Sequence, residues 1–298
     1  MADRQRILAG TTATLSWQAV DQDGEPSDPG VTTVTVTRSD GSTVLASTPA
    51  TAAGELRTVG IPAQECDILT AVWSGATATG TTYVDVVGGV YFTTARLRAA
   101  HPEVSVETTY PPEAIIAKRL VTETKFEQAT KTAFVPRFRV IPVYDSIARE
   151  QLVRSVRWLQ LQDGTFITDP AEIAVRCRLS TAGVVVTVPA AAVGAVVGFD
   201  TPPSDVAEAA LLYTKHQLTS TASQVDMRVL ALNTPDGSMM RFATPGVAGW
   251  VTGIPEIDEV LKRYTAPKLP RSIRTDQSPS WVYPTYVDTS FDPAWWER

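Results

Sequence analysis

The residues that most often carry out chemistry are few in this chain of 298 residues. It holds two histidines, His101 and His216, and two cysteines, Cys66 and Cys177. A histidine serves as a general base, and a cysteine as a nucleophile, only when a suitable partner group lies beside it. Neither histidine stands in a motif that supplies such a partner. We therefore predict a structural or surface role for each histidine.

The sequence contains no short motif of a common enzyme class. It lacks a Gly-x-Ser-x-Gly turn, a Gly-x-x-x-x-Gly-Lys loop and a Cys-x-x-Cys pair. The two cysteines are too far apart to suggest a metal site or a disulfide framework, so we expect buried free thiols in a reducing compartment. We predict no catalytic residue, no cofactor and no metal. A hydrolase with a lid domain is the disfavoured alternative.

Two charged groups need a separate interpretation. Four acids lie close together near the start of the chain: Asp21, Asp23, Glu25 and Asp28. Carboxylates can hold calcium, but their spacing does not match the helix-loop-helix site, and a solvated turn is favoured. Six cations form the second group: Lys118, Arg119, Lys125, Lys131, Arg137 and Arg139. They could line a DNA channel, pair with acids of a neighbouring subunit, or form a solvated helix face.

The formal net charge is −6, and the charges are spread unevenly. Residues 1–88 hold four arginines and no lysine against ten acids, whereas residues 91–157 hold 11 basic and seven acidic groups. Binding to phosphates depends on Lys and Arg, so the first part is not expected to grip DNA. The first residues lack the apolar segment of a secretory signal, and export by that route is not expected.

The last residues are rich in aromatic side chains. Six of the 23 aromatics fall within residues 281–298: Trp281, Tyr283, Tyr286, Phe291, Trp295 and Trp296. Prolines between 267 and 293 disfavour a helix, so residues 266–298 are predicted to form an extended arm. Large rings on such an arm usually need a partner surface, although folding back onto the chain's own core is the alternative.

The secondary structure predicted from the sequence, which must position the residues named above, changes along the chain. Residues 1–88 hold 16 threonines and alternate apolar with polar residues, which predicts an all-β immunoglobulin-like sandwich. Gly88 and Gly89 are predicted to be the hinge that follows. From 134 to 199 the strand pattern returns, with strands that include 156–159 and 173–179. The uncharged run 182–199 just reaches membrane-spanning length, but its valines, glycines and Pro189 favour buried strands.

Four helices are predicted, at about 93–100, 112–130, 203–221 and 254–265, with a hairpin or loop at 225–250. The expected buried faces carry Ile116, Leu120, Phe126 and Ala129 on the second helix, Val206, Ala210, Tyr213 and Leu218 on the third, and Ile254, Ile257, Leu261 and Tyr264 on the last. In the last helix, Asp258 with Lys262 and Glu259 with Arg263 form i,i+4 pairs. The fold class is therefore α+β and multidomain, with a β subdomain inserted between helices.

Four stretches carry a family resemblance: 92–98, 110–137, 202–206 and 252–261. The residues of these stretches and the order in which they occur resemble those of the head-to-tail adaptor, or head-completion, proteins of long-tailed bacteriophages, especially those of actinobacterial hosts. The resemblance covers residues 91–265. It implies that residues 90–265 form an adaptor core. The preceding sandwich departs from the minimal family pattern.

The resemblance implies a structural, non-enzymatic protein of the virion neck, made in the host cytoplasm and without membrane contact. It implies a homo-oligomeric ring, typically of about twelve copies, beneath the portal protein and above a stopper or tail-terminator protein, through which double-stranded DNA passes. Ile116, Leu120, Tyr213, Ile254, Ile257, Leu261 and Tyr264 would then pack the core or ring, and the aromatic arm would bind portal or a neighbouring subunit. In the alternative, a surface-binding module, the sandwich engages capsid protein or host carbohydrate.

Overall fold

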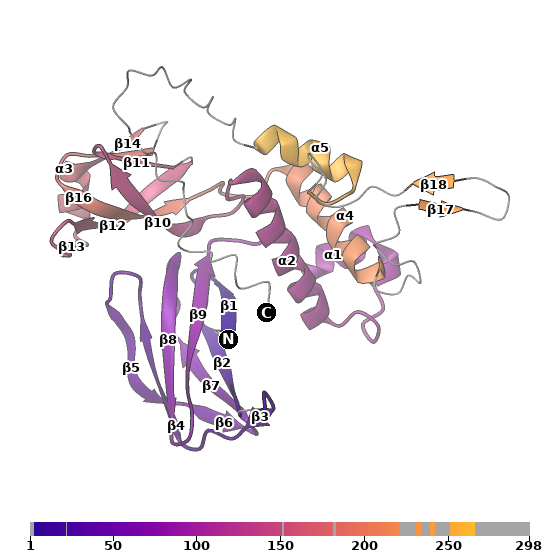
Figure 1. Cartoon of the computed structure of the whole chain (residues 1–298), viewed down its shortest axis with the longest axis horizontal. Helices are drawn as coiled ribbons and strands as arrows, with labels where there is room; N and C mark the ends of the chain where they lie inside the picture. Colours follow the sequence, from indigo (N-terminus) through magenta and orange to yellow (C-terminus); the bar gives the residue numbers. More distant parts are fainter. Residues whose placement is uncertain are drawn as a thin grey trace. The chain divides into compact units, whose positions relative to one another are not determined.

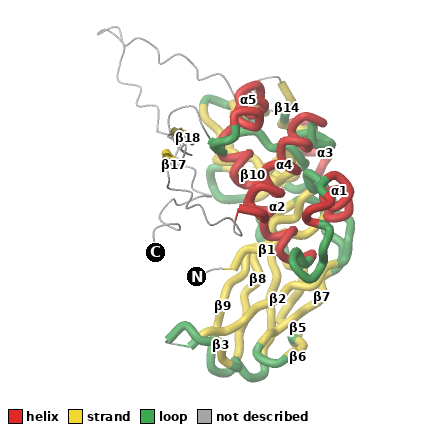
Figure 2. Tube along the Cα trace, turned by 90° about the vertical axis from the view of Figure 1, so that its right-hand side faces the viewer, coloured by secondary structure: helices red, strands yellow, loops and turns green. Residues whose placement is uncertain are grey.

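Alternating threonine and apolar residues place the first part of the chain in two packed β-sheets, as the computed structural model shows (Figure 1). The structure describes residues 3–21, 23–150, 152–180, 183–220, 231–233, 239–241 and 251–265. Residues 1–266 form one compact unit. The regular elements of residues 3–87 are all strands, and every described helix follows them in the chain (Figure 2).

The two sheets of the sandwich enclose an apolar core. The five-stranded sheet has the order β1 (Asp3–Leu8), β9 (Thr79–Val87), β8 (Asp67–Gly75), β4 (Thr32–Thr37) and β5 (Thr43–Pro49). The second sheet has the order β3 (Pro26–Ser27), β2 (Ala13–Val20), β7 (Leu56–Ile61) and β6 (Thr51–Ala53). Trp17 and Trp73 stack between the sheets with ring centroids 5.9 Å apart. The predicted sandwich is thus present, and β1 pairs in parallel with β9.

The helices pack around a second hydrophobic cluster. They are α1 (Thr94–Ala100), the 3₁₀ turn η1 (Pro102–Val104), α2 (Pro112–Thr130), α4 (Ser204–Ser220) and α5 (Pro255–Tyr264). Thr93 caps α1, because its hydroxyl accepts a hydrogen bond of 3.1 Å from the Arg96 amide. The four predicted helices are confirmed to within about two residues at each end. None of the described helices is long and apolar enough to cross a bilayer.

Between α2 and α4 the chain builds an antiparallel sheet of seven strands. Its order is β13 (Phe166–Ile167), β12 (Val153–Leu161), β16 (Ala190–Val197), β10 (Arg137–Tyr144), β11 (Ile147–Arg149), β15 (Gly183–Val186) and β14 (Cys177–Ser180). The predicted strand at 173–179 is wrong in its first half, which is the helix α3 (Pro170–Arg176). Asp169 starts this helix by accepting a hydrogen bond from the Ala171 amide at 3.0 Å.

A short hairpin lies between α4 and α5. Strands β17 (Ala231–Asn233) and β18 (Met239–Arg241) are antiparallel, with Leu232 opposite Met240. This agrees with the hairpin predicted at 225–250, whose remaining residues lie outside the described part of the chain. The predicted arm at 266–298, with its six aromatic residues, also lies outside the described residues.

The buried face of α2 differs from the predicted one. Ile116 is 39% exposed and Leu120 is only half-buried, so both are wrong as core residues. Phe126 is buried as predicted, and Ala129 is half-buried. The other buried side chains of the helix are Ile115, Thr122, Glu123, Glu127 and Thr130. The apolar pattern therefore indicated part of the wrong face of α2, because two acids and two threonines point inward. The Thr122 hydroxyl lies 3.0 Å from that of Thr214, and the Thr130 hydroxyl donates a hydrogen bond of 2.9 Å to the Phe126 carbonyl. The partners of the two glutamates are described below.

Helices α4 and α5 follow the predicted pattern. Val206, Ala210, Tyr213 and Leu218 are all buried on α4. On α5, Ile257 and Leu261 are buried, whereas Ile254 and Tyr264 are partly buried against the same cluster. The expected pair of Glu259 and Arg263 has an N–O distance of 3.8 Å. Tyr213, Ile257 and Leu261 therefore pack inside their own subunit.

The junction after the sandwich is tightly packed. The Gly88 amide donates a hydrogen bond of 2.8 Å to the Pro136 carbonyl. A Cβ added to Gly88 would lie 2.6 Å from the Cβ of Pro136, closer than carbon atoms tolerate. The glycine is therefore required for this close approach, and the predicted hinge lies at a packed junction.

Candidate functional site

The largest group of buried charges lies where the inner face of α2 meets β1, β9 and β10. It holds three cations and three carboxylates: Arg6, Arg119, Arg137, Asp85, Glu123 and Glu127. Their side chains are at most 13% exposed, and Glu123 is completely buried. We call these six residues the buried charge cluster. Because buried charges are stable only when paired, their equal numbers are the first condition for such a cluster.

Glu123 lies at the centre of the cluster. One carboxylate oxygen accepts a hydrogen bond of 3.0 Å from the Tyr91 amide. The other accepts a hydrogen bond from the Arg6 guanidinium, which reaches α2 from the first strand of the sandwich. Arg119 and Arg137 approach the same carboxylate at 3.7 and 3.9 Å. Glu123 is thus contacted from the sandwich, from its own helix and from β10.

Glu127, one turn further along α2, has a different set of partners. Its Oε1 lies 2.7 Å from Arg137 Nε and accepts a hydrogen bond of 3.1 Å from the Tyr91 hydroxyl. Burial raises the pKa of the Glu127 carboxyl, although the charge of Arg137 opposes that effect. Burial, followed by the Glu127 charge, raises the pKa of Tyr91 well above its usual range. The phenol therefore remains a hydrogen-bond donor.

The arginines experience burial and pairing in opposite directions. Burial, followed by the charge of Arg137, lowers the pKa of Arg6, although Glu123 opposes this. Burial also lowers the pKa of Arg119. For Arg137, the carboxylates around it outweigh burial and raise its pKa. Arg6 donates a hydrogen bond to Glu123, Arg119 donates one of 2.9 Å to the Phe92 carbonyl, and Arg137 forms an ion pair with Glu127. The cluster therefore holds elements together rather than moving protons.

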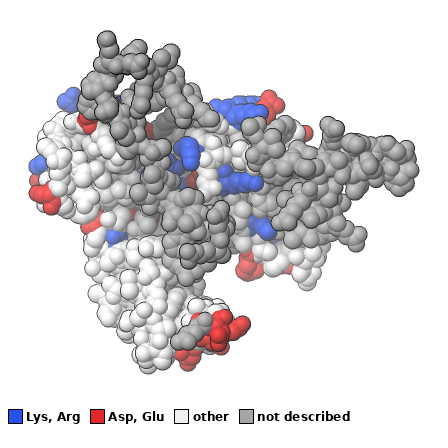
Figure 3. Space-filling view, in the orientation of Figure 1, with Lys and Arg blue, Asp and Glu red and all other residues white. Residues whose placement is uncertain are grey.

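The structure separates the six cations that the sequence grouped as channel or inter-subunit charges. Arg119 and Arg137 belong to the buried charge cluster, so that prediction is wrong for them. Arg139 pairs with Glu150 at 3.2 Å. Lys125 donates a hydrogen bond of 2.6 Å to the Tyr213 hydroxyl. For Lys118 and the exposed Lys131 the prediction stays open. Figure 3 shows Lys and Arg atoms over the helical part of this face, and Asp and Glu atoms at one end of the sandwich.

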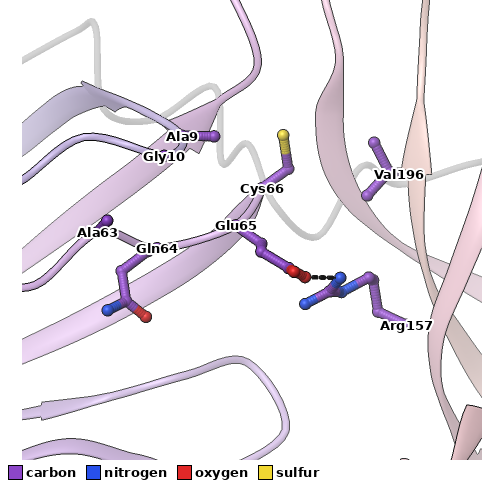
Figure 4. A pocket seen from close by; sticks show the side chains of 8 residues that line it. All are labelled: Ala9, Gly10, Ala63, Gln64, Glu65, Cys66, Arg157 and Val196. Atoms are coloured by element: carbon purple, nitrogen blue, oxygen red, sulfur yellow. Dashed lines mark ion pairs between the residues drawn. The ribbon is translucent and has the colours of Figure 1, made fainter.

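An open pocket of 560 Å³ lies between the sandwich and β12 and β16 (Figure 4). Glu65 and Arg157 form an ion pair across it. Cys66 also lines the pocket, and its thiol contacts the Pro136 carbonyl at 3.8 Å. Burial raises the pKa of this thiol, which keeps it protonated and makes it a poor nucleophile. The pocket therefore offers an ion pair but no activated group.

The remaining predicted groups have ordinary surroundings. His101 follows α1, and His216 is exposed on α4. Cys66 and Cys177 are free but only half-buried, which corrects the expectation of full burial. Asp21 accepts hydrogen bonds from the amides of Asp23 and Glu25, both at 2.9 Å, as in the predicted turn. In the described part of the chain, no cluster of three or more His, Cys, Asp and Glu residues could hold a metal.

Sequence reasoning missed the buried charge cluster, although one signal for it was present. Glu123 and Glu127 lie four residues apart on one helix, where two acids repel each other unless cations neutralise them. Arg119 and Arg137 are close in sequence and could have been assigned that role. Arg6 is 117 residues from Glu123, and no local pattern connects them.

Fold and site together define the class of this protein. It is an α+β protein in which a β-sandwich, a helical core and an antiparallel sheet meet around paired buried charges. No family model and no curated protein matches the sequence. One solved structure, a crystal structure of ICOS in complex with ICOS-L and an anti ICOS-L VNAR domain, aligns at 11% identity, over 68% of this chain and 90% of that chain. The TM-score is 0.20, so the alignment carries no argument about fold or function.

Proposed function

We propose that this chain is a structural subunit that assembles into a ring, as the head-to-tail adaptor of a tailed phage. In this function it lies beneath the portal protein, joins it to a stopper or tail-terminator protein, and leaves a passage for DNA. The order of elements supports the proposal, since an antiparallel sheet is inserted between two long helices and a short helix precedes the final segment.

The observation that best supports assembly into a ring is the uncharged exposed face of α2. After the first turn, its exposed residues are Ile116, Ala117, Val121 and Gln128, and none is charged. A long helix on a monomer's surface normally presents charged residues to water. Here the two glutamates of these turns point inward, and apolar side chains remain outside. Such a face is suited to contact with a second subunit.

The half-buried Lys118 and Lys125 also belong to α2 and lie beside this uncharged face. A neighbouring subunit could therefore present an apolar surface edged with carboxylates. Because a ring joins each subunit's face to a different face of the next, α2 needs to supply only one half of the contact. Ile116 and Leu120, wrong as core residues, fit this ring-packing role.

The sandwich fits the same proposal as an added domain. One sheet contains the neighbours β9-β8-β4-β5 and the other β2-β7-β6, with β1 in parallel beside β9. This order corresponds to an immunoglobulin-like sandwich with an extended G-F-C sheet. We propose that this domain lies on the outside of the neck.

The test replaces one exposed apolar residue of α2 by a charge. We expect Val121→Arg to leave the subunit folded but to prevent ring formation on the portal protein, as seen by electron microscopy of the mixture. Val175→Arg is the matched control, because Val175 is 78% exposed on α3, outside this face. Rings formed equally well by both variants would contradict the proposal.

The arm is tested separately. Deletion of residues 267–298 should leave residues 1–266 folded and abolish portal binding in a pull-down. If the truncated chain binds portal as well as the complete chain does, the arm is not the clamp, and the proposed α2 contact is unaffected.

A further inference from the structure

Strand β1 makes contacts from both of its faces. Successive side chains of a strand point to opposite sides, and Gln5 and Arg6 show this alternation. The Gln5 side chain donates to the Ser16 hydroxyl at 3.0 Å and accepts from the Ser16 amide at 3.3 Å, so it ties β1 to the second sheet of the sandwich. Arg6 points the other way and contacts Glu123 of α2 and, at 3.8 Å, Asp85 of β9.

The contact between Arg6 and Glu123 differs in kind from the contacts that the other cations make with this carboxylate. Arg119 and Arg137 lie 3.7 and 3.9 Å from its carboxylate, beyond ordinary hydrogen-bond length. Arg6 is the guanidinium that hydrogen-bonds to it. Glu123 is completely buried, so it has no access to water that could replace this donor. Without Arg6, the Oε2 atom of Glu123 would keep only Arg137, at 3.9 Å, as a cationic partner.

The position of β1 gives this contact a structural consequence. Its backbone pairs with β9 from Asp3 opposite Thr82 to Leu8 opposite Val87, and the chain leaves β9 directly into the helical core. The packed Gly88 amide bonded to Pro136 lies one residue beyond that strand. The first strand thus reaches the end of the sandwich that meets α2 and β10.

We propose that β1 acts as a latch: Arg6 inserts into the helical core, and the sandwich and the core therefore unfold together rather than independently. The sandwich is then not a separable domain, because the stability of the helical core depends on it. A buried carboxylate that loses its hydrogen-bonded cation destabilises its surroundings strongly, so loss of Arg6 should be felt on α2 more than within the sandwich. This inference does not depend on the proposed ring.

The test is hydrogen exchange of the complete chain with Arg6→Met, which keeps the length of the side chain and removes its charge. We expect amides of residues 119–130 to exchange roughly 100-fold faster, while those of β4 and β8 stay within about threefold. Arg57→Met is the matched control. Arg57 is also a buried arginine, but its partners Asp28, Gly30 and Gly54 all belong to the sandwich.

Two further variants keep the proposal testable. If Arg6→Met does not fold, Arg6→Lys keeps the charge but loses the planar fork, and should raise exchange on α2 about tenfold. With Glu123→Gln as background, adding Arg6→Met should increase exchange on α2 far less than it does alone. Exchange on α2 within threefold of the unaltered chain in Arg6→Met, or an equal effect from Arg57→Met, would overturn the latch.

Discussion

Helices α2 and α5 pack into the same hydrophobic cluster but differ in what pairs with their buried acids, which is arginines on α2 and backbone amides on α5. On α5, Ile257 and Leu261 face the cluster, and Glu259 faces water. Asp258 of the same helix is buried, and its carboxylate accepts hydrogen bonds from the backbone amides of Thr252 and Gly253 at 2.8 and 3.2 Å. On α2, Ile115 and Phe126 enter the cluster, while Glu123 and Glu127 are buried beside them. Helix α2 packs against two surfaces. Its apolar side chains contact the hydrophobic cluster, and its glutamates contact the arginines of the buried charge cluster.

The difference shows what determines a buried face. Periodicity of apolar residues identifies the face when the neighbouring surface is apolar, as for α5. Where two parts of a chain meet through paired charges, the buried residues include acids, and the pattern indicates the wrong side. The comparison can be tested by changing the charged part of α2 and the apolar part of α5 in turn.

The largest loss should come from breaking the buried charge cluster. We expect Arg137→Met to lower the free energy of unfolding by about 3–5 kcal/mol, because it leaves two buried carboxylates with fewer cations. Urea unfolding measures this loss. The double variant Glu127→Gln/Arg137→Met removes both charges and keeps an acceptor for the Tyr91 hydroxyl, so it should lose less than Arg137→Met alone. Losses that simply add would show that the pair is not coupled.

Removal of apolar volume from α5 should cost somewhat less. Leu261 is 1% exposed, and Leu261→Ala leaves a cavity in the cluster, so we expect a loss of about 3 kcal/mol. Val260→Ala, at a half-buried position on the same helix, should lose less than about 1.5 kcal/mol. If the two substitutions cost the same in urea unfolding, α5 is not held by the face that its pattern predicts.

The sequence was sufficient where local rules apply. The sandwich follows from alternation, and the buried side of α4 follows from the spacing of Val206, Ala210, Tyr213 and Leu218. The missed helix α3 also had a local signal, since Asp169 followed by Pro170 is a typical helix start. The β-branched Ile173 and Val175 favour a strand, but the cap and the proline determine the helix.

The buried charge cluster could not be predicted in the same way. Arg6 and Glu123 are paired because β1 lies beside β9, a contact between positions far apart in the sequence. Gly88 poses the same difficulty, since both a hinge and a close packing contact favour glycine. The role of the arm stays a prediction, because its residues lie outside the described part of the chain.

A smaller effect should appear in the pH dependence of stability. Burial raises the pKa of Glu127 in the folded state above its unfolded value of about 4.3. Its contribution to stability is then complete below the unfolded pKa and is lost as the pH rises through the folded pKa. The unfolding free energy of the unaltered chain minus that of Glu127→Gln should therefore fall as the pH rises from about 4 to about 7, both read from urea titrations. A rise would mean that pairing with Arg137 outweighs burial.

The smallest effect should come from the exposed pair of α5. Glu259 and Arg263 are 75% and 60% exposed and lie 3.8 Å apart, so water and salt screen their attraction. Glu259→Gln should change the free energy of unfolding by less than about 0.5 kcal/mol. The same substitution at Glu123 of α2 should cost about 2 kcal/mol or more, because the Arg6 guanidinium would lose its buried carboxylate. Urea unfolding in low and high salt measures both. Equal losses would mean that α2 and α5 hold their charges in the same way, and that burial does not distinguish them.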